Sequence, residues 1–195
     1  MSIFQIVMLA ATGFFAYKMY EHIQGLDESD TETGAATKNA AKTMQDMNAD
    51  TLQNEADEAF AAGDVEAAKA LLNEAETKDP NSGEILGKLG FILAKEGDMN
   101  RAIMYYEKAL SLNSSDDMLH NAIASLFRQT HEYKRAQEHY LKALEIDPAY
   151  EVTYFNYANL LVDMDNEEEA RLMYEKALVI KPDFMQAKFE MDKLS

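Results

Sequence analysis

Cysteine is absent from this 195-residue chain, which excludes disulfides, a thiolate nucleophile and thiolate metal sites. Proline and glycine are scarce, at three and eight residues, and this scarcity favours long helices with short turns over a multi-stranded sheet. Basic residues are also few, 18 against 35 acidic residues, for a net charge of −17. Without a basic stripe that displaces counterions from phosphate, nucleic acid is not an expected partner. The composition predicts an all-α protein.

What the chain does contain is a unit of 34 residues that occurs four times between residues 49 and 184. Three units share a tyrosine followed by an alanine and a leucine, and every unit has the same small residue in one column. The tyrosines are Tyr106, Tyr140 and Tyr174; the small residues are Ala68, Ala102, Ala136 and Ala170; a late column holds Pro80, Ser114, Pro148 and Pro182. Small residues at fixed places let two helices approach closely, while large residues fill the spaces between them.

This pattern resembles the tetratricopeptide repeat, a helical hairpin of the same period with alanine columns and a late proline. The resemblance implies a right-handed superhelix, or α-solenoid, of four hairpins at residues 49–82, 83–116, 117–150 and 151–184, followed by a cap helix at 185–195. One hairpin cannot bury its apolar face alone, so the hairpins are expected to stack. The second helices should begin near Val65, Met99, Tyr133 and Glu167.

Both ends of the array depart from the pattern. Glu55 lies in a column that is apolar in the other units, and an end unit tolerates this because one of its faces has no neighbour. Met44 and Met47 continue the apolar face of the first helix, which predicts that this helix starts early. In the cap segment we expect Phe189 to face the core and Lys188 and Lys193 to face solvent.

Residues 3–17 carry no charge, and the apolar run extends to residue 20 if Lys18 reaches toward lipid headgroups. As a helix, residues 3–20 would span roughly 27 Å, which is close to the thickness of a bilayer core. We interpret residues 1–24 as an N-terminal hydrophobic helix and single-pass membrane anchor. A cleaved signal peptide, which usually begins with positive charge, and a buried helix of the soluble domain are the alternatives.

Residues 25–48 are polar and acidic. This composition predicts a linker, and a helix in its latter part is an alternative. Lys18, Lys38 and Lys42 all lie on the carboxyl side of the predicted span, and only the α-amine lies before it. By the positive-inside tendency, this asymmetry predicts that the repeats lie on the cytoplasmic side of the membrane.

The resemblance also implies that the first helices of the hairpins line a concave groove, which binds a peptide or a helix of a partner protein. The residues it places there are Lys88, Phe91, Lys95, Asn121, Ser125, Arg128, Phe155, Asn156 and Asn159. Asparagine can donate to and accept from a peptide backbone, arginine can hold a carboxylate, and phenylalanine can anchor apolar groups. The carboxylate clamp of chaperone-binding relatives is not matched, because Gly87 and Met118 stand where that clamp has lysine. Ordinary exposed side chains are the alternative explanation.

Catalysis, cofactors and metals are not expected. The four histidines fall in a packing column (His120), in a turn (His131), beside a repeat tyrosine (His139) and near the anchor (His22), and none has a helical zinc-site spacing. Nucleophile elbows and phosphate-binding glycine loops are also missing from the sequence.

The sequence therefore predicts a membrane-tethered adaptor or scaffold for protein–protein interaction. Its acidity is explained most simply by a solvated outer surface, and a basic partner is the narrower interpretation. Two alternatives keep the fold: an exported cell-envelope assembly or secretion factor that faces outward, and a non-catalytic regulatory subunit of a membrane enzyme complex. Self-association through the apolar ends of the array is a further possibility.

Overall fold

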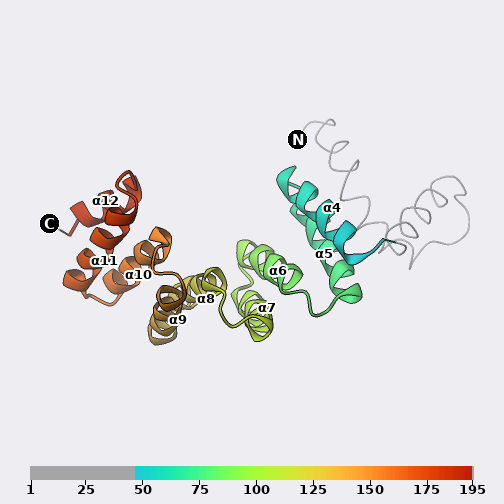
Figure 1. The fold of residues 1–195 in the computed structure, drawn as a ribbon, viewed down its shortest axis with the longest axis horizontal. Helices are drawn as coiled ribbons and strands as arrows, with labels where there is room; N and C mark the ends of the chain where they lie inside the picture. Colours follow the sequence, from blue (N-terminus) through green and yellow to red (C-terminus); the bar gives the residue numbers. More distant parts are fainter. Residues whose placement is uncertain (1–46, 195) are drawn as a thin grey trace, which may run out of the picture. The chain divides into compact units, whose positions relative to one another are not determined.

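Only helices occur in the part of the chain that the structure, a computed structural model, describes, which is residues 47–194 (Figure 1). They are α4 Ala49–Ala61, α5 Val65–Lys78, α6 Gly83–Lys95, α7 Met99–Leu112, α8 Asp117–Gln129, α9 Tyr133–Ile146, α10 Glu151–Asp163, α11 Glu167–Ile180 and α12 Met185–Asp192. The second helices begin at the four residues that the repeat register predicts, so the expected all-α fold is confirmed for these residues.

The chain divides between Ile92 and Leu93 into two compact units. In the first unit α4 packs against α5, and in the second α8 packs against α9 and α10 packs against α11. Neighbouring hairpins of the second unit are joined by contacts of α7 with α8 and of α9 with α10, and α12 covers α11. Helical hairpins are thus the repeating element, as the tetratricopeptide pattern predicts.

Each hairpin turns at a residue with positive φ. Gly63 and Gly97 have φ of 83° and 85°, and the equivalent His131 and Asp165 have φ of 61° and 59°. The next residue then donates its N–H to a carbonyl of the preceding helix; these bonds are Asp64 to Ala59, Asp98 to Leu93, Glu132 to Phe127 and Asn166 to Leu161, at 2.8 to 2.9 Å. The four turns are the same structure, because a left-handed residue satisfies the carbonyls that the helix end leaves open.

Short polar side chains fix where several helices begin. The Asp64, Asp98 and Asp116 carboxylates accept hydrogen bonds from backbone N–H groups three residues later. Asn48 does the same for Thr51 at 2.8 Å, so α4 begins at Ala49 and Met47 lies ahead of it. The expected early start of this helix at Met47 is therefore wrong, because an N-cap at Asn48 satisfies the first free N–H groups.

The alanine and tyrosine columns form the centre of the packing. Ala68, Ala102, Ala136 and Ala170 are fully buried, and so are Tyr140 and Tyr174. An alanine lets the two helices of a hairpin approach closely, and the large tyrosine ring fills the space beside it. Burial raises the pKa of Tyr106, Tyr140 and Tyr174 to about 12, so these residues act as neutral, protonated side chains.

The end helix α12 buries Ala187 and leaves Phe189 63% exposed. The expectation that Phe189 faces the core is therefore wrong. By the repeat register Phe189 is equivalent to Asn121 and Phe155 on the first helices, whereas Ala187 falls in a column that packs against neighbouring helices. The Lys193 ammonium group lies over one face of this exposed ring, 4.3 Å from its centroid. Lys188 and Lys193 face solvent, as predicted.

The proposed anchor and all of the linker except its last two residues lie outside the described residues. Within residues 47–194, no helix has the length and apolar character that crossing a bilayer requires. Glu55 is exposed on α4, which confirms that the first unit tolerates a charge there.

Candidate partner-binding surface

Six of the nine predicted groove residues lie on two neighbouring helices of the second unit, and all of them except Phe155 are polar. Asn121, Ser125 and Arg128 are on α8, and Asn156 and Asn159 are on α10. Residues separated by three, four or seven positions share one face of a helix, so each helix presents its members of the set together. We call these five polar residues, together with Asp163 of α10, the polar strip.

Two hydrogen bonds join the α8 and α10 sides of the polar strip. The Asn156 side-chain amide donates to Asn121 Oδ1 at 3.2 Å, and Arg128 Nε donates to Asp163 Oδ2 at 2.6 Å. Both pairs are 35 residues apart in sequence, so each bond connects one hairpin to the next. The strip is therefore a linked surface, and its arginine charge is already compensated.

Tyrosines of the second helices orient two more members of the strip. Ser125 Oγ lies 3.0 Å from the Tyr140 hydroxyl, and the Tyr174 hydroxyl donates to Asn159 Oδ1 at 2.6 Å. The two pairs occupy the same register positions in successive hairpins. Because the tyrosine rings are fixed in the core, they hold Ser125 and Asn159 in defined positions at the surface.

The two predicted apolar anchors are partly used for packing. Phe155 lies between Tyr174, at 5.9 Å between ring centroids, and Phe184, at 5.1 Å. In the first unit Phe91 makes an edge contact with Phe60 at 5.6 Å and remains 44% exposed. Phe91 therefore keeps apolar surface that a partner can cover, and Phe155 is half-buried.

Lys88 of the first unit is held by two carboxylates. Its ammonium group lies 2.7 Å from Asp57 on α4 and 2.9 Å from Glu84 on α6. Burial opposes its charge, but hydrogen bonds with Asp57 and Glu84 raise the pKa of Lys88 above its ordinary value. Lys95 is exposed at the end of α6.

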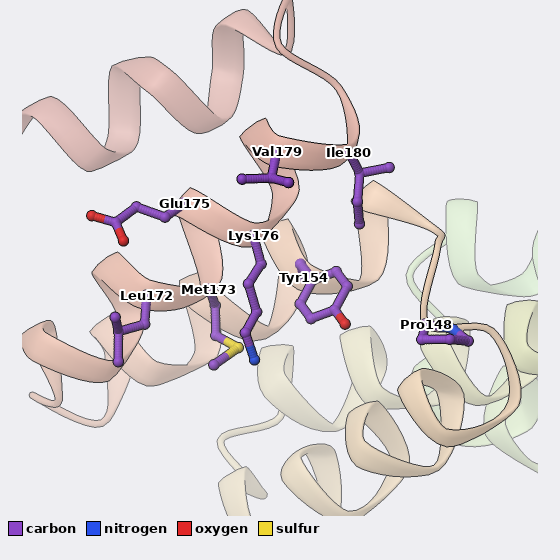
Figure 2. Close-up of a pocket in the computed structure, with 8 residues that line it drawn as sticks. All are labelled: Pro148, Tyr154, Leu172, Met173, Glu175, Lys176, Val179 and Ile180. Carbon is purple, nitrogen blue, oxygen red and sulfur yellow. The ribbon is translucent and has the colours of Figure 1, made fainter.

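The structure also contains an open apolar pocket on the last hairpin, with a volume of about 510 Å³ (Figure 2). It is lined by Pro148, Tyr154, Leu172, Met173, Glu175, Lys176, Val179 and Ile180. Figure 2 shows that most of these side chains come from α11. Val179 is 82% exposed, so the pocket is an open feature of the surface.

Sequence reasoning missed two pairings. Asp163 was not among the predicted groove residues, although it neutralises Arg128. His120 and His139 were considered separately, yet their Nδ1 atoms lie 3.0 Å apart. The repeat register could have found the histidine pair, since both positions lie in columns that face the partner helix of the hairpin. Within residues 47–194 there is no cluster of three side chains that could hold a metal ion.

These features define a helical-hairpin repeat protein with an ordered polar surface on its first helices. Models of the tetratricopeptide repeat match residues 81–149 and 139–172. Residues 81–172 are therefore tetratricopeptide repeats. No curated protein sequence matches it.

Several solved structures share the fold. MamA from Desulfovibrio magneticus RS-1 is 21% identical, with a TM-score of 0.69 over 75% of this chain and 82% of that chain. YrrB, described as a tetratricopeptide-repeat protein with an unusual peptide-binding site, is 18% identical, with a TM-score of 0.68 over 95% and 87%. Pseudomonas aeruginosa pilF is 23% identical, with a TM-score of 0.68 over 75% and 67%. At these identities the likeness concerns the fold.

Proposed function

We propose that this protein is a non-catalytic interaction scaffold, which holds a peptide segment of a partner protein on the polar strip and is tethered to a membrane by residues 3–20. The family and the peptide-binding site named for the similar YrrB support a role in protein binding. The observation that carries the proposal for this chain is the set of oriented, partly exposed amides on α8 and α10.

The hydrogen bonds within the strip leave complementary groups for a ligand. The Tyr174 hydroxyl donates to Asn159 Oδ1, so the side-chain N–H groups of Asn159 remain as the donors for a ligand. Asn121 accepts through Oδ1 and Asn156 donates through Nδ2, which leaves an amide donor on Asn121 and an amide acceptor on Asn156. Alternating donors and acceptors at fixed positions suit the backbone of a bound peptide.

The charges of the polar strip and of the whole chain favour a peptide that is neutral at the strip and charged on either side of it. Arg128 and Asp163 compensate each other at 2.6 Å, so the strip itself carries little net charge. The chain as a whole has a net charge of −17. We infer that the bound peptide is neutral where it meets the amides and basic beside them, because a basic segment is attracted to an acidic protein.

Tethering makes a weak interaction effective. A protein held at a bilayer meets membrane-associated partners at a raised effective concentration, so even modest affinity suffices for capture. The uncharged run of residues 3–17 and its length support this part of the proposal.

The binding role is tested by affinity purification of the full-length protein from its native membranes, followed by mass spectrometry. Asn156→Ala removes the side-chain oxygen that is proposed to accept from the peptide backbone. Asn159→Asp removes the amide donors but retains the oxygen to which the Tyr174 hydroxyl donates. We expect the double variant to lose specific partners. The matched control is Asn73→Ala with Asn100→Ala, which removes two exposed amides from second helices. Equal recovery of every partner by both double variants would contradict the role of the strip.

The tether is tested separately. Alkaline carbonate should leave the full-length protein in the membrane fraction, and deletion of residues 1–24 should release it. A reporter that is active only in the cytoplasm, fused after Ser195, should be active. A silent reporter would instead favour the exported, outward-facing alternative.

A further inference from the structure

A pair of histidines lies between the two helices of the third hairpin. His120 Nδ1 on α8 lies 3.0 Å from His139 Nδ1 on α9, and His120 Nε2 lies 3.3 Å from the backbone carbonyl oxygen of Ser114. His120 is buried, at 7% exposure, and the ring of His139 also contacts Phe127. The pair thus links three segments: the turn before α8, α8 itself, and α9.

The hydrogen-bond partners determine the tautomers. A carbonyl oxygen can only accept, so His120 Nε2 carries the hydrogen. Neutral His120 then has an acceptor at Nδ1, and His139 Nδ1–H must be the donor. For the neutral pair the result is a directed chain from His139 through His120 to Ser114. One added proton can be shared if His139 accepts at Nδ1, but a second proton leaves no acceptor between the two rings.

The pair is confined to one hairpin. At the register positions of His120 and His139 the other hairpins have Leu52 with Leu71, Leu86 with Tyr105, and Tyr154 with Met173. None of these side chains titrates near neutral pH. Of the four hairpins, the third is therefore the one with histidine at both of these register positions, where the others have apolar or aromatic side chains.

The turn that His120 contacts is unusual as well. Ser114 occupies the column that holds proline in the other three units, so its backbone is less restricted. Asn113 Oδ1 accepts from the Ser115 N–H at 3.2 Å, and the His120 ring adds the second side-chain link to this joint. The histidine therefore restrains a joint that lacks the stiffness of proline.

Burial and nearby cations make protonation of the pair unfavourable, and two aspartates partly offset this effect for His120. Lys142 and Arg135 of α9 lie near the pair, and Asp116 and Asp117 lie at the start of α8. From α7, Glu107 approaches Arg135 at 3.7 Å, and from α10 the Tyr157 hydroxyl accepts from Gln137 at 2.9 Å. Burial first, and then the charges of His120, Lys142 and Arg135, lower the pKa of His139 to about 4. Burial also lowers the pKa of His120.

We propose that His120 and His139 form an acid-sensitive latch, which holds α8, α9 and the Ser114 joint together when both rings are neutral and releases the third hairpin when they are protonated. When both rings are protonated, neither Nδ1 atom can accept, so two donors face each other. Two charged rings 3.0 Å apart also repel each other in a partly buried site. The latch does not depend on the binding role of the polar strip.

The direction of the pH effect follows from linkage. A histidine has a pKa near 6.5 in the unfolded chain, and the folded pKa of both rings is lower. The unfolded or open hairpin therefore binds more protons, so the stabilisation is present above about pH 6.5 and is lost as the pH falls toward about 4.

Native-state hydrogen exchange of the full-length protein at pH 7.5 and pH 5.0, corrected for intrinsic rates, tests the latch. The lower value lies above the ordinary carboxyl pKa of about 4, so histidines dominate the change. We expect protection in α8 and α9 to fall about tenfold or more relative to α10 and α11. An unchanged ratio between the two hairpins would overturn the proposal, and this comparison needs no variant.

Variants then assign the effect to the pair. His120→Leu with His139→Leu installs the residues of the first hairpin and should abolish the pH-dependent ratio. The control is His131→Asn, which removes an exposed histidine at a positive-φ turn that asparagine also tolerates, and it should retain the ratio. Retention of the pH-dependent ratio in the double variant would also overturn the proposal.

Discussion

Arg128 Nε donates to Asp163 Oδ2 at 2.6 Å and thereby joins α8 to α10 across one repeat. Both side chains are about one third exposed, at 32% and 33%. Asp163 already compensates the charge of Arg128, so a carboxylate of a partner would have to share this guanidinium or compete with Asp163 for it. The arginine that the sequence pattern assigns to ligand recognition is therefore also part of the packing between hairpins.

This ion pair should contribute modestly to stability. We expect Arg128→Ala and Asp163→Ala each to lower the free energy of unfolding, with a coupling energy of about 0.5 kcal/mol, because the pair is partly screened by solvent. A double-mutant cycle in urea measures the coupling. The coupling should decrease in 1 M salt, and a value that is independent of salt would contradict an electrostatic origin.

The hairpin turns should distinguish glycine from other residues. Gly97→Ala places a side chain at φ of 85° and should lower the free energy of unfolding by about 1 kcal/mol. Asp165→Gly, at the equivalent position with φ of 59°, should raise it by a few tenths of a kcal/mol to about 1 kcal/mol, because glycine adopts this conformation without strain. Thermal and urea unfolding check both changes; the same sign for the two substitutions would contradict the shared turn geometry.

The repeat tyrosines should differ in how much their hydroxyls contribute. Tyr174→Phe removes the 2.6 Å hydrogen bond to Asn159, and it should lower the free energy of unfolding by about 1 kcal/mol. Tyr106 is the matched control, since Phe91 occupies the register position of Asn159 and the described residues include no hydrogen bond of the Tyr106 hydroxyl. Tyr106→Phe should therefore be close to neutral in urea unfolding, and equal losses at the two positions would refute this assignment.

Thr153 offers a stabilising substitution. Its side chain is 1% exposed on α10, and its Oγ1 is buried without a hydrogen-bond partner. Thr153→Val keeps the branched shape and removes the unpaired polar atom, so the free energy of unfolding should rise by about 0.5 to 1 kcal/mol. Thr51→Val at the equivalent position of α4 is the control, because the Thr51 hydroxyl donates to Asn48 at 3.0 Å. A larger gain at Thr51 than at Thr153 would contradict the argument.

The fold could be predicted well from the sequence because each structural requirement occurs once per unit. The positions of Ala136 and Tyr140 recur at a fixed spacing, so they indicate the helix pairing without any three-dimensional information. The start of α4 was missed because an apolar stripe was followed past Asn48, whose side chain caps the helix. The prediction for Phe189 was wrong because it relied on the hydrophobicity of this residue. Its register position, shared with Asn121 and Phe155, indicates the exposed face of the helix.

The site was predicted less completely for a physical reason. The register gives the face on which Asn121, Arg128 and Asn156 lie, but it does not give the contacts that long side chains make with each other. The Arg128–Asp163 pair joins adjacent hairpins. The His120–His139 pair joins two consecutive helices through residues that are 19 positions apart in the sequence. Finding such pairs requires two columns to be considered together with the distance between them.

The composition of α12 makes its outer face a poor partner for a further helix. Lys188 and Asp192 are exposed at register positions where α10 has Tyr154 and Ala158. A further second helix docked there would bury two charges without compensation. This solvated face belongs to one short helix, so extra 34-residue units inserted ahead of Met185 would leave it unchanged.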